Sequence, residues 1–488
     1  MVLELSNIIF TDQDDSVPSS GVEQILNTSI ANTLAGNDII TGNGDDYGFE
    51  NLGTLNTEDG NDTVRGTATY TGISLGFGST FDSGKGNDVI IGNSFVDGIL
   101  NVGTFNTSDG NDVISGYSHG DGFENVGTFN AGDGNDVITG DGISDGIVNV
   151  GTFNTDDGND TITGSAQMTG IFTDYGSTFN TGKGNDIITG SGANGQVGIS
   201  NGGTINTVEG EDSLLSWGTF INTGEVFLGD GNDSIISSSV SIYSLKNSGF
   251  IGTGDGNDII NLSGFMANFI ANDGVIDTGN GEDSILLEGS FFNNKGGIFL
   301  GDGNDSITAN NNINGYGPGS RLDNFNFIGT GDGNDIITSA DVIYNEGVID
   351  TGNGDDSIIV DGGVNGTGDG YGIYNNGGAI NTGNGNDSII ANEGFKSAQN
   401  SSGAWFLGEG DDYIKGYGSG DFYGGNGNDT LELTPGTYTV GIWGEAGESP
   451  IFTKGDQLMI TSEFEKLKAG STIYDFTSLT AGQIIIVT

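Results

Sequence analysis

The sequence predicts an all-β protein, a parallel β-solenoid of about seventeen coils with a cap at each end. Three observations support this fold class. A Gly-x-Asp tripeptide recurs along most of the chain, an aliphatic residue stands two places after every Asp, and apolar and polar positions alternate before it. Self-similarity with a period of about 20 to 50 residues is typical of stacked repeats.

The Asp that ends each Gly-x-Asp tripeptide sets the register of the repeat. Successive Asp residues lie mostly 21 to 26 positions apart, with two spacings of 30 and 31 and a last one of 17. The two long units contain polar, Gly-rich stretches, Asn310 to Ser320 and Gly362 to Gly372, which we expect to be loops. The seventeen residues are Asp38, Asp62, Asp88, Asp112, Asp136, Asp160, Asp186, Asp212, Asp233, Asp258, Asp283, Asp305, Asp335, Asp356, Asp387, Asp412 and Asp429.

Apolar columns on either side of the Asp predict the core. They lie thirteen and seven places before it and two places after it, as at Phe123, Phe129 and Ile138 around Asp136, and the first column includes Tyr374. Alternation with period two predicts one strand before the turn and a second, shorter strand after it. A single unit cannot bury this face, but stacked units can.

Asn stands eleven places before the Asp in thirteen units, as at Asn101 and Asn125. Inward amides can hydrogen-bond one another and the backbone at a bend, so we expect a structural role for this column. Gly stands two places before the Asp in all seventeen units, where a tight turn needs a positive φ.

The turn itself predicts a cation site. A typical copy runs from Thr107 to Ile114 and supplies one carboxylate, Asp112, and several backbone carbonyls. Calcium takes about six to eight hard oxygen ligands, so two stacked turns could complete one shell. Ten units add an acidic residue three places before the Asp, as at Asp109 and Asp133. Like charges one coil apart repel unless a cation lies between them, and we therefore predict all seventeen Asp as metal ligands.

The last copy, Gly424 to Glu432, matches the nonapeptide G-G-x-G-x-D-x-U-x in full. The chain therefore resembles the RTX, or haemolysin-type calcium-binding repeat, family over about residues 33 to 432. The resemblance implies Ca²⁺ as the cofactor, export by type I secretion through an uncleaved C-terminal signal, and an extracellular or cell-surface location. Coils of that family are shorter and usually contain two motifs. With one motif in each coil, we expect multiple calcium ions in one column on one edge.

Composition restricts the partners. The chain has 67 Asp plus Glu against 11 Lys plus Arg, a net charge of −56, which disfavours nucleic acid and anionic membranes. No apolar run is long enough for membrane insertion. The sequence has no Cys and one His, His119, so zinc or iron sites built from thiolate and imidazole are excluded. Met1 to Phe10 has no basic residue, unlike the n-region of a Sec signal.

We expect three segments: an N-terminal cap over 1–32, calcium-binding solenoid repeats over 33–433, and a β-rich C-terminal cap with a secretion signal over 434–488. Apolar and polar residues alternate in segments such as Thr437 to Ile442, which we expect to be strands of this cap. The chain ends in an aliphatic run that resembles a type I secretion signal.

The expected function is that of a secreted structural, cell-surface, or matrix and adhesive protein, not an enzyme. Its expected partners are calcium and either cell-surface polysaccharide or further copies of itself. No HExxH, GxSxG or P-loop pattern occurs, and His119 reads as a surface-loop residue. One alternative is a carbohydrate-binding protein or a carboxylate-dependent polysaccharide-processing enzyme. A lesser alternative is ice binding through a ladder of Thr five places before the Asp, namely Thr57, Thr107, Thr155, Thr181, Thr278 and Thr330.

Overall fold

A computed structural model describes residues 2–18, 23–264, 269–288, 291–310, 321–362, 370–398, 403–444 and 449–488. The chain divides into two compact units, Met1–Gly254 (unit 1) and Asp255–Thr488 (unit 2). Most of each predicted loop, 311–320 and 363–369, lies outside the described residues. Helical segments within the described ranges are three 3-10 turns, η1 (Leu5–Asn7), η2 (Ala193–Gly195) and η3 (Phe476–Ser478).

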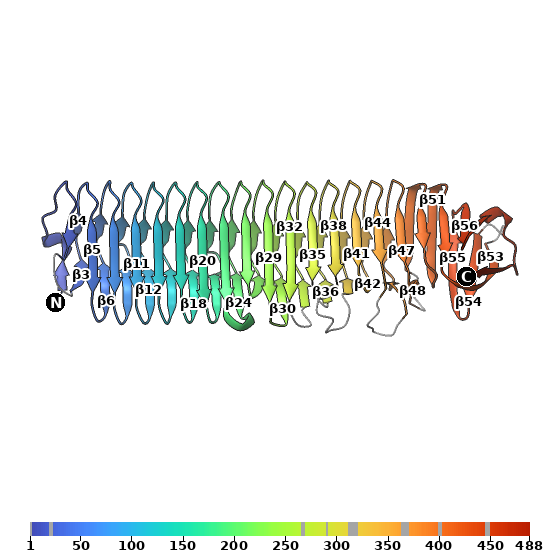
Figure 1. Ribbon diagram of the computed structural model, residues 1–488, viewed down its shortest axis with the longest axis horizontal. Helices are drawn as coiled ribbons and strands as arrows, with labels where there is room; N and C mark the ends of the chain where they lie inside the picture. The colour runs from blue at the N-terminus through green and yellow to red at the C-terminus, as the bar shows by residue number, and fades with distance from the viewer. Residues whose placement is uncertain are drawn as a thin grey trace. The chain divides into compact units, whose positions relative to one another are not determined.

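One coil of unit 1 shows the repeating plan. β14 (Val113–Tyr117) lies in sheet B, β15 (Asp121–Asn125) in sheet A and β16 (Thr128–Asn130) in sheet C, after which β17 (Val137–Asp141) returns to sheet B (Figure 1). Each strand pairs in parallel with the strand at the same place in the next coil. Phe129, for example, is the register partner of Phe153 in β19 (Thr152–Asn154). The predicted parallel β-solenoid is confirmed within each unit.

The other strands of unit 1 follow this order. Sheet A contains β1 (Val2–Glu4), β3 (Gln24–Asn27), β6 (Tyr47–Asn51), β9 (Thr71–Leu75), β12 (Asp97–Asn101), β18 (Asp145–Asn149), β21 (Thr169–Thr173), β24 (Val197–Asn201), β27 (Thr219–Asn222) and β30 (Tyr243–Asn247). Sheet B contains β2 (Ser16–Val17), β5 (Ile39–Asn43), β8 (Thr63–Thr67), β11 (Val89–Asn93), β20 (Thr161–Ala166), β23 (Ile187–Gly192), β26 (Ser213–Trp217) and β29 (Ser234–Ser239). Sheet C contains β4 (Ile30–Asn32), β7 (Thr54–Asn56), β10 (Thr80–Asp82), β13 (Thr104–Asn106), β22 (Thr178–Asn180), β25 (Thr204–Asn206), β28 (Glu225–Phe227) and β31 (Phe250–Gly252).

Unit 2 repeats the same three-sheet plan. Sheet A contains β33 (Phe269–Asn272), β36 (Phe291–Asn294), β39 (Arg321–Asn324), β42 (Val342–Asn345), β45 (Ile373–Asn375) and β48 (Phe395–Ser397). Sheet B contains β32 (Ile259–Gly264), β35 (Ser284–Glu288), β38 (Ser306–Asn310), β41 (Ile336–Ser339), β44 (Ser357–Val360), β47 (Ser388–Ala391), β50 (Tyr413–Lys415) and β52 (Thr430–Leu433). Sheet C contains β34 (Val275–Asp277), β37 (Gly297–Phe299), β40 (Phe327–Gly329), β43 (Val348–Asp350), β46 (Ala379–Asn381), β49 (Ala404–Gly410) and β51 (Gly420–Gly427).

Antiparallel pairing is found after residue 435. β53 (Gly436–Trp443) pairs with β54 (Ser449–Lys454) and with β58 (Ile484–Val487), and β54 pairs with β55 (Gln457–Ser462). β56 (Lys466–Ala469) pairs with β57 (Thr472–Asp475) in the same sense. β55 and β56 also continue sheets C and B by parallel pairing with β51 and β52. The boundaries expected for the two caps stay predictions.

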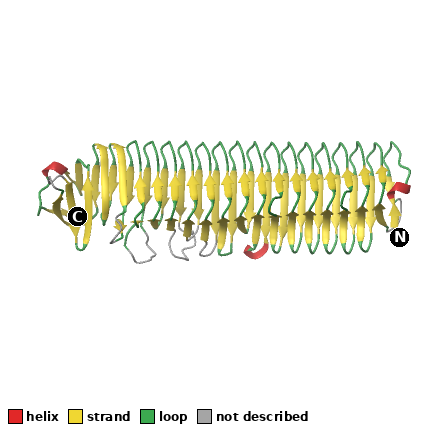
Figure 2. Ribbon diagram, turned by 180° about the vertical axis from the view of Figure 1, so that it is seen from behind, coloured by secondary structure: helices red, strands yellow, loops and turns green. Residues whose placement is uncertain are grey.

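The strand expected before the turn is in fact two strands. The chain bends at Val126 and Gly127, so that β15 and β16 lie in different sheets. Figure 2 shows short loops joining the strands at the edges of the sheets. A Cβ on Gly127 would lie 2.0 Å from the carbonyl oxygen of Gly103, which is why the corner excludes larger residues. The bend adds a third sheet to the two-stranded unit that alternation alone suggested.

The predicted core columns are buried. Phe123, Phe129 and Ile138 are all 0% exposed. The rings of the column seven places before the Asp pack against one another from coil to coil, edge to face at Phe105 and Phe129 and stacked at Phe153 and Phe179, whose centroids are 4.4 Å apart. One prediction is wrong: Tyr374 is half-buried, and its neighbour Ile373 takes the inward place as the register partner of Ile343. The unit that ends at Asp387 is offset there by one residue, which reverses the face of a strand.

The Asn column has the structural role expected of it. Nδ2 of Asn101 donates to Oδ1 of Asn125 at 2.8 Å and to the carbonyl of Thr128 at 2.8 Å. Each buried amide therefore bridges to the next coil at the bend between sheets A and C.

A search of the described residues finds no helix with the length and apolar character that a membrane span requires.

A candidate cation column

The predicted metal ligands lie in the turn between sheets C and B. In the turn from Ala131 to Asp136, Gly132 and Gly134 have φ of 99° and 155°, in the region that favours glycine. Stacking adds a second constraint, because a Cβ on Gly134 would lie 1.4 Å from the carbonyl oxygen of Gly110 in the preceding coil. Gly134 is therefore needed for close approach of the backbones as well as for its φ, and the close approach recurs at the corresponding Gly110 and Gly158.

All seventeen Asp side chains are buried, with at most 1% of their surface exposed. Within each unit, the structure brings these side chains into single file. The backbone N–H of Asp88 donates to Oδ1 of Asp112 at 2.7 Å, and that of Asp112 donates to Oδ1 of Asp136 at 2.7 Å. Unit 2 has the same contact from Asp283 to Asp305 at 2.8 Å. Each carboxylate thus touches its neighbour's backbone one coil away.

In fifteen members of the file, the second carboxylate oxygen has no hydrogen-bond donor. Oδ2 is buried and without a hydrogen-bond partner at Asp38, Asp62, Asp88, Asp112, Asp136, Asp160, Asp186, Asp212, Asp283, Asp305, Asp335, Asp356, Asp387, Asp412 and Asp429. The hydroxyl of Thr107 lies close enough to Asp112 to lower the pKa of that carboxyl, but it donates its proton to the carbonyl of Ala131 at 2.8 Å. A buried charged oxygen without a partner is costly, so these atoms are the best candidates for cation ligands in the described part of the chain.

Burial raises the pKa of the file toward neutrality. Loss of hydration is the largest cause, and it raises the pKa of Asp136 to about 8 and that of Asp88 to about 7. The N–H of Asp112 lowers the pKa of Asp136, whereas the neighbouring carboxylates of Asp160 and Asp112 raise it. At neutral pH the file therefore needs either protons or cations to balance its charge.

The acidic residues three places before the Asp do not join the file. The side chain of Asp109 is 57% exposed and pairs with Lys85 at 2.5 Å, one coil away. Lys183 and Glu209 form the same kind of pair at 2.9 Å. The turn thus carries a solvent-exposed row of acidic residues and, separately, the buried file of Asp carboxylates.

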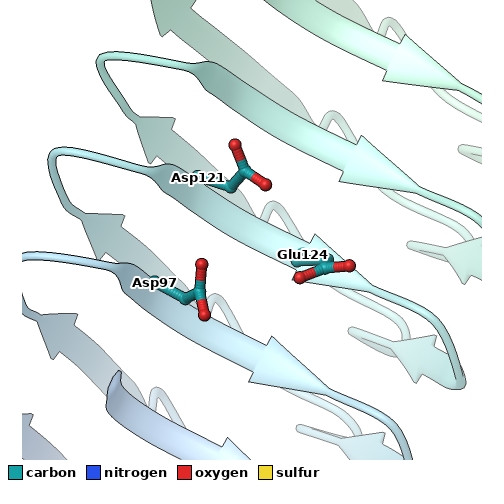
Figure 3. Close-up of side chains that lie close together, drawn as sticks. All are labelled: Asp97, Asp121 and Glu124. Atoms are coloured by element: carbon teal, nitrogen blue, oxygen red, sulfur yellow. The ribbon is translucent and has the colours of Figure 1, made fainter. Parts of the chain in front are cut away.

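Three acids that the repeat analysis did not single out converge on sheet A. Asp97 of β12 and Asp121 and Glu124 of β15 each place one carboxylate oxygen within 4.8 Å of the others (Figure 3). Burial, then the charge of their neighbours, raises the pKa of Asp97 and Glu124. Glycosidases place their two carboxyl groups about 5 to 9.5 Å apart, so this spacing is short for that chemistry. Asp97 and Asp121 hold the same place in successive repeats, so the repeat register alone could have paired them, whereas the approach of Glu124 to both became visible only in the structure.

Two further predicted features are located by the structure. His119 is exposed, and its ring stacks on Phe95 at 4.6 Å. The Thr column five places before the Asp points inward: Thr107, Thr155 and Thr278 are 0% exposed. Those Thr residues hold adjacent turns together and do not form an outer ladder.

Comparisons with known proteins find a likeness among solved structures. No family model matches the chain, and no curated protein matches it. A crystal structure of a hyperactive, Ca²⁺-dependent, β-helical antifreeze protein from an Antarctic bacterium is similar over 78% of this chain and 84% of that one. The identity is 19% and the TM-score 0.27, a degree of likeness that supports no statement about function. The RTX resemblance stays a prediction.

Proposed function

We propose that the chain is a calcium-binding β-solenoid whose file of buried Asp is neutralised by Ca²⁺. The observation that carries the proposal is the buried, unpartnered Oδ2 that repeats from coil to coil. A cation is the simplest partner for such an atom, because every additional carboxylate in the file raises the cost of leaving the others ionised.

The donor set favours a hard cation. The turns offer carboxylate and carbonyl oxygens, and the chain has no Cys. The residues that would hold the ion are the Asp of the file, as Asp112 and Asp136, together with turn carbonyls such as that of Gly110. Calcium tolerates irregular shells of oxygen ligands better than magnesium does, and it supplies positive charge without any redox chemistry.

The same features support a structural role outside the cell. Sites built from one carboxylate per turn are expected to be weak, and weak sites fill where calcium is abundant, as in extracellular fluid. Folding would then be coupled to metal, since a ligand that binds only the folded state stabilises it. We propose a secreted surface or matrix protein, exported by type I secretion, without catalytic activity.

Far-UV circular dichroism of the full chain in calcium and in chelator tests the metal. We expect the β structure to be lost at a clearly lower temperature in chelator than in calcium at pH 8, with magnesium restoring little of the difference. A chain that is equally stable in chelator would contradict the proposal. Sedimentation in calcium tests the matrix role, for which we expect polymers that chelator dissolves.

Ice binding is a second candidate, favoured by a different row of Thr from the one first considered. Thr104, Thr128 and Thr152 are register partners on sheet C and are half-buried or exposed. They continue in register to Thr178 and Thr204. Thermal hysteresis of the calcium-loaded chain tests this function, and a Thr128→Tyr variant should abolish any activity that the row provides.

A further inference from the structure

A groove crosses four successive coils of unit 1, at the corner between sheets A and C. Its volume is about 500 Å³. We call it the corner groove, and we define it by the side chains of Tyr175, Thr178, Thr204, Thr223, Glu225 and Phe250. It lies away from the Asp file, which occupies the corner between sheets C and B.

The groove follows from the residues at successive corners. Earlier coils place Val126 or Val150 there, each 40% exposed, before the corner Gly. Two extra residues then lengthen the corner after β21, and Tyr175 stands on this loop. The next corners carry Gly202 and Thr223 where the earlier ones carry Val. The projecting ring of Tyr175 is thus followed by corners made of small residues, Gly202, Gly203, Thr223 and Gly224, which we call the shelf.

The floor of the shelf cannot carry side chains. A Cβ on Gly203 would lie 2.3 Å from the carbonyl oxygen of Ser177, and a Cβ on Gly224 would lie 2.0 Å from that of Gly203. The shelf is therefore set by coil stacking and does not depend on a mobile side chain for its depth.

Tyr175 forms one end of the groove and is 91% exposed. Its backbone N–H donates to Oδ1 of Asp174 at 2.8 Å, which holds the loop in place. Phe250 lies in the last of the four coils, half-buried, with its ring 5.3 Å from that of Phe227. Aromatic rings thus stand in the first and last coils of the groove.

Polar side chains connect these two ends in one row. Thr178 is the register partner of Thr204, Thr204 of Glu225, and Glu225 of Phe250. Adjacent strands lie about 4.8 Å apart, so the row spans about 14 Å. It presents two hydroxyls and a carboxylate at regular intervals beside apolar ring surface, which is the mixed lining that orients a small ligand.

We propose that the corner groove binds a neutral oligosaccharide. The ring of Tyr175 lies against the apolar face of one sugar, and Thr178, Thr204 and Glu225 hydrogen-bond to sugar hydroxyls. A polyhydroxylated chain matches this row, because the two Thr hydroxyls can both donate and accept hydrogen bonds and the carboxylate of Glu225 can accept them. The net charge of −56 and the carboxylate of Glu225 disfavour an anionic chain. This inference goes beyond the proposed function and does not require metal in the Asp file.

Calorimetric titration of the full chain in saturating calcium tests the inference. The probes are cellohexaose, chitohexaose, mannohexaose and maltohexaose, with hexagalacturonate as the anionic comparison. We expect at least one neutral hexasaccharide to bind and hexagalacturonate to bind at least tenfold more weakly. Tyr175→Ala should weaken binding at least tenfold, and Thr204→Ala about fivefold, as expected for one hydrogen bond of about 1 kcal/mol.

Phe77→Ala is the matched control. Phe77 is 93% exposed on a corner loop of the same length, but the next corner carries Val102. The affinity of the Phe77→Ala variant for the neutral hexasaccharide should equal that of the unmodified chain. The inference is overturned if no neutral probe binds, if Tyr175→Ala binds normally, or if Phe77→Ala loses as much affinity. Sugar binding by a chain that is as stable in chelator as in calcium would instead contradict the calcium proposal alone.

Discussion

The carbonyl oxygen of Gly110 points at Cα of Gly134 in the next coil, so closely that a Cβ on Gly134 would lie 1.4 Å from it. The two turns are in backbone contact at this point, and the Asp file is aligned by that contact. Replacement of this Gly should therefore disturb both the stack and the file.

We expect Gly134→Ala to lower the free energy of unfolding by about 3 kcal/mol or more, because the backbone of one turn must move away from the next. Urea unfolding in calcium measures the effect. Gly78→Ala is the control, since Gly78 also has a positive φ, 75°, but has open space around its Cβ position. It should cost about 1 kcal/mol, and an equal loss in both variants would show that φ alone matters.

Asp136→Asn should have effects of opposite sign with and without calcium. In chelator at pH 8 we expect a gain of about 1 kcal/mol or more, because the variant removes a buried carboxyl whose pKa is raised to about 8. In saturating calcium we expect a loss of about 2 kcal/mol, because a ligand is removed. Unfolding midpoints in both conditions, with the exposed Asp133→Asn as a control of little effect, decide the matter.

Metal-free stability should fall as pH rises. The folded-state pKa values of Asp112, Asp88 and Asp136 are raised to about 6, 7 and 8 from an ordinary value of 3.8. The folded state therefore holds protons that the unfolded state releases, so this contribution is fully present below about pH 4 and is lost progressively up to about pH 8.

Urea unfolding in chelator at pH 5 and pH 8 measures that dependence. Calcium should reverse it, since protons and calcium compete for the same oxygens. Equal stability of the metal-free chain at the two pH values would mean that the file does not titrate in this range.

The column of buried Asn side chains that includes Asn125 should contribute more to the free energy of unfolding than the half-buried Asn side chains of sheet C, such as Asn130. We expect Asn125→Ala to cost about 2 to 3 kcal/mol, because it removes bonds of 2.8 Å to Asn149 and to the carbonyl of Thr152 and leaves buried groups unpaired. Asn130→Ala removes one half-buried contact of 2.9 Å to Asn106 and should cost at most about 1 kcal/mol. Similar losses would argue against a special role for the buried column.

Local pattern was enough to predict the repeat, its register and its core. The aliphatic residue after each Asp, such as Ile138, and the ring before it, Phe129, are both fully buried. These positions are predictable because one short motif recurs in register, and any residue repeated in every coil meets its own copy in the next.

Tertiary structure decided what sequence pattern could not. The bend at Val126 and Gly127 turns one expected strand into two, because the corner depends on how the backbones of adjacent coils approach. The same stacking directs Thr107 inward, brings Glu124 close to Asp97 and Asp121, and leaves a shelf beside Tyr175. Each of these relationships joins residues from different coils or different faces, where the shape of the coil, and not the motif, sets the distance.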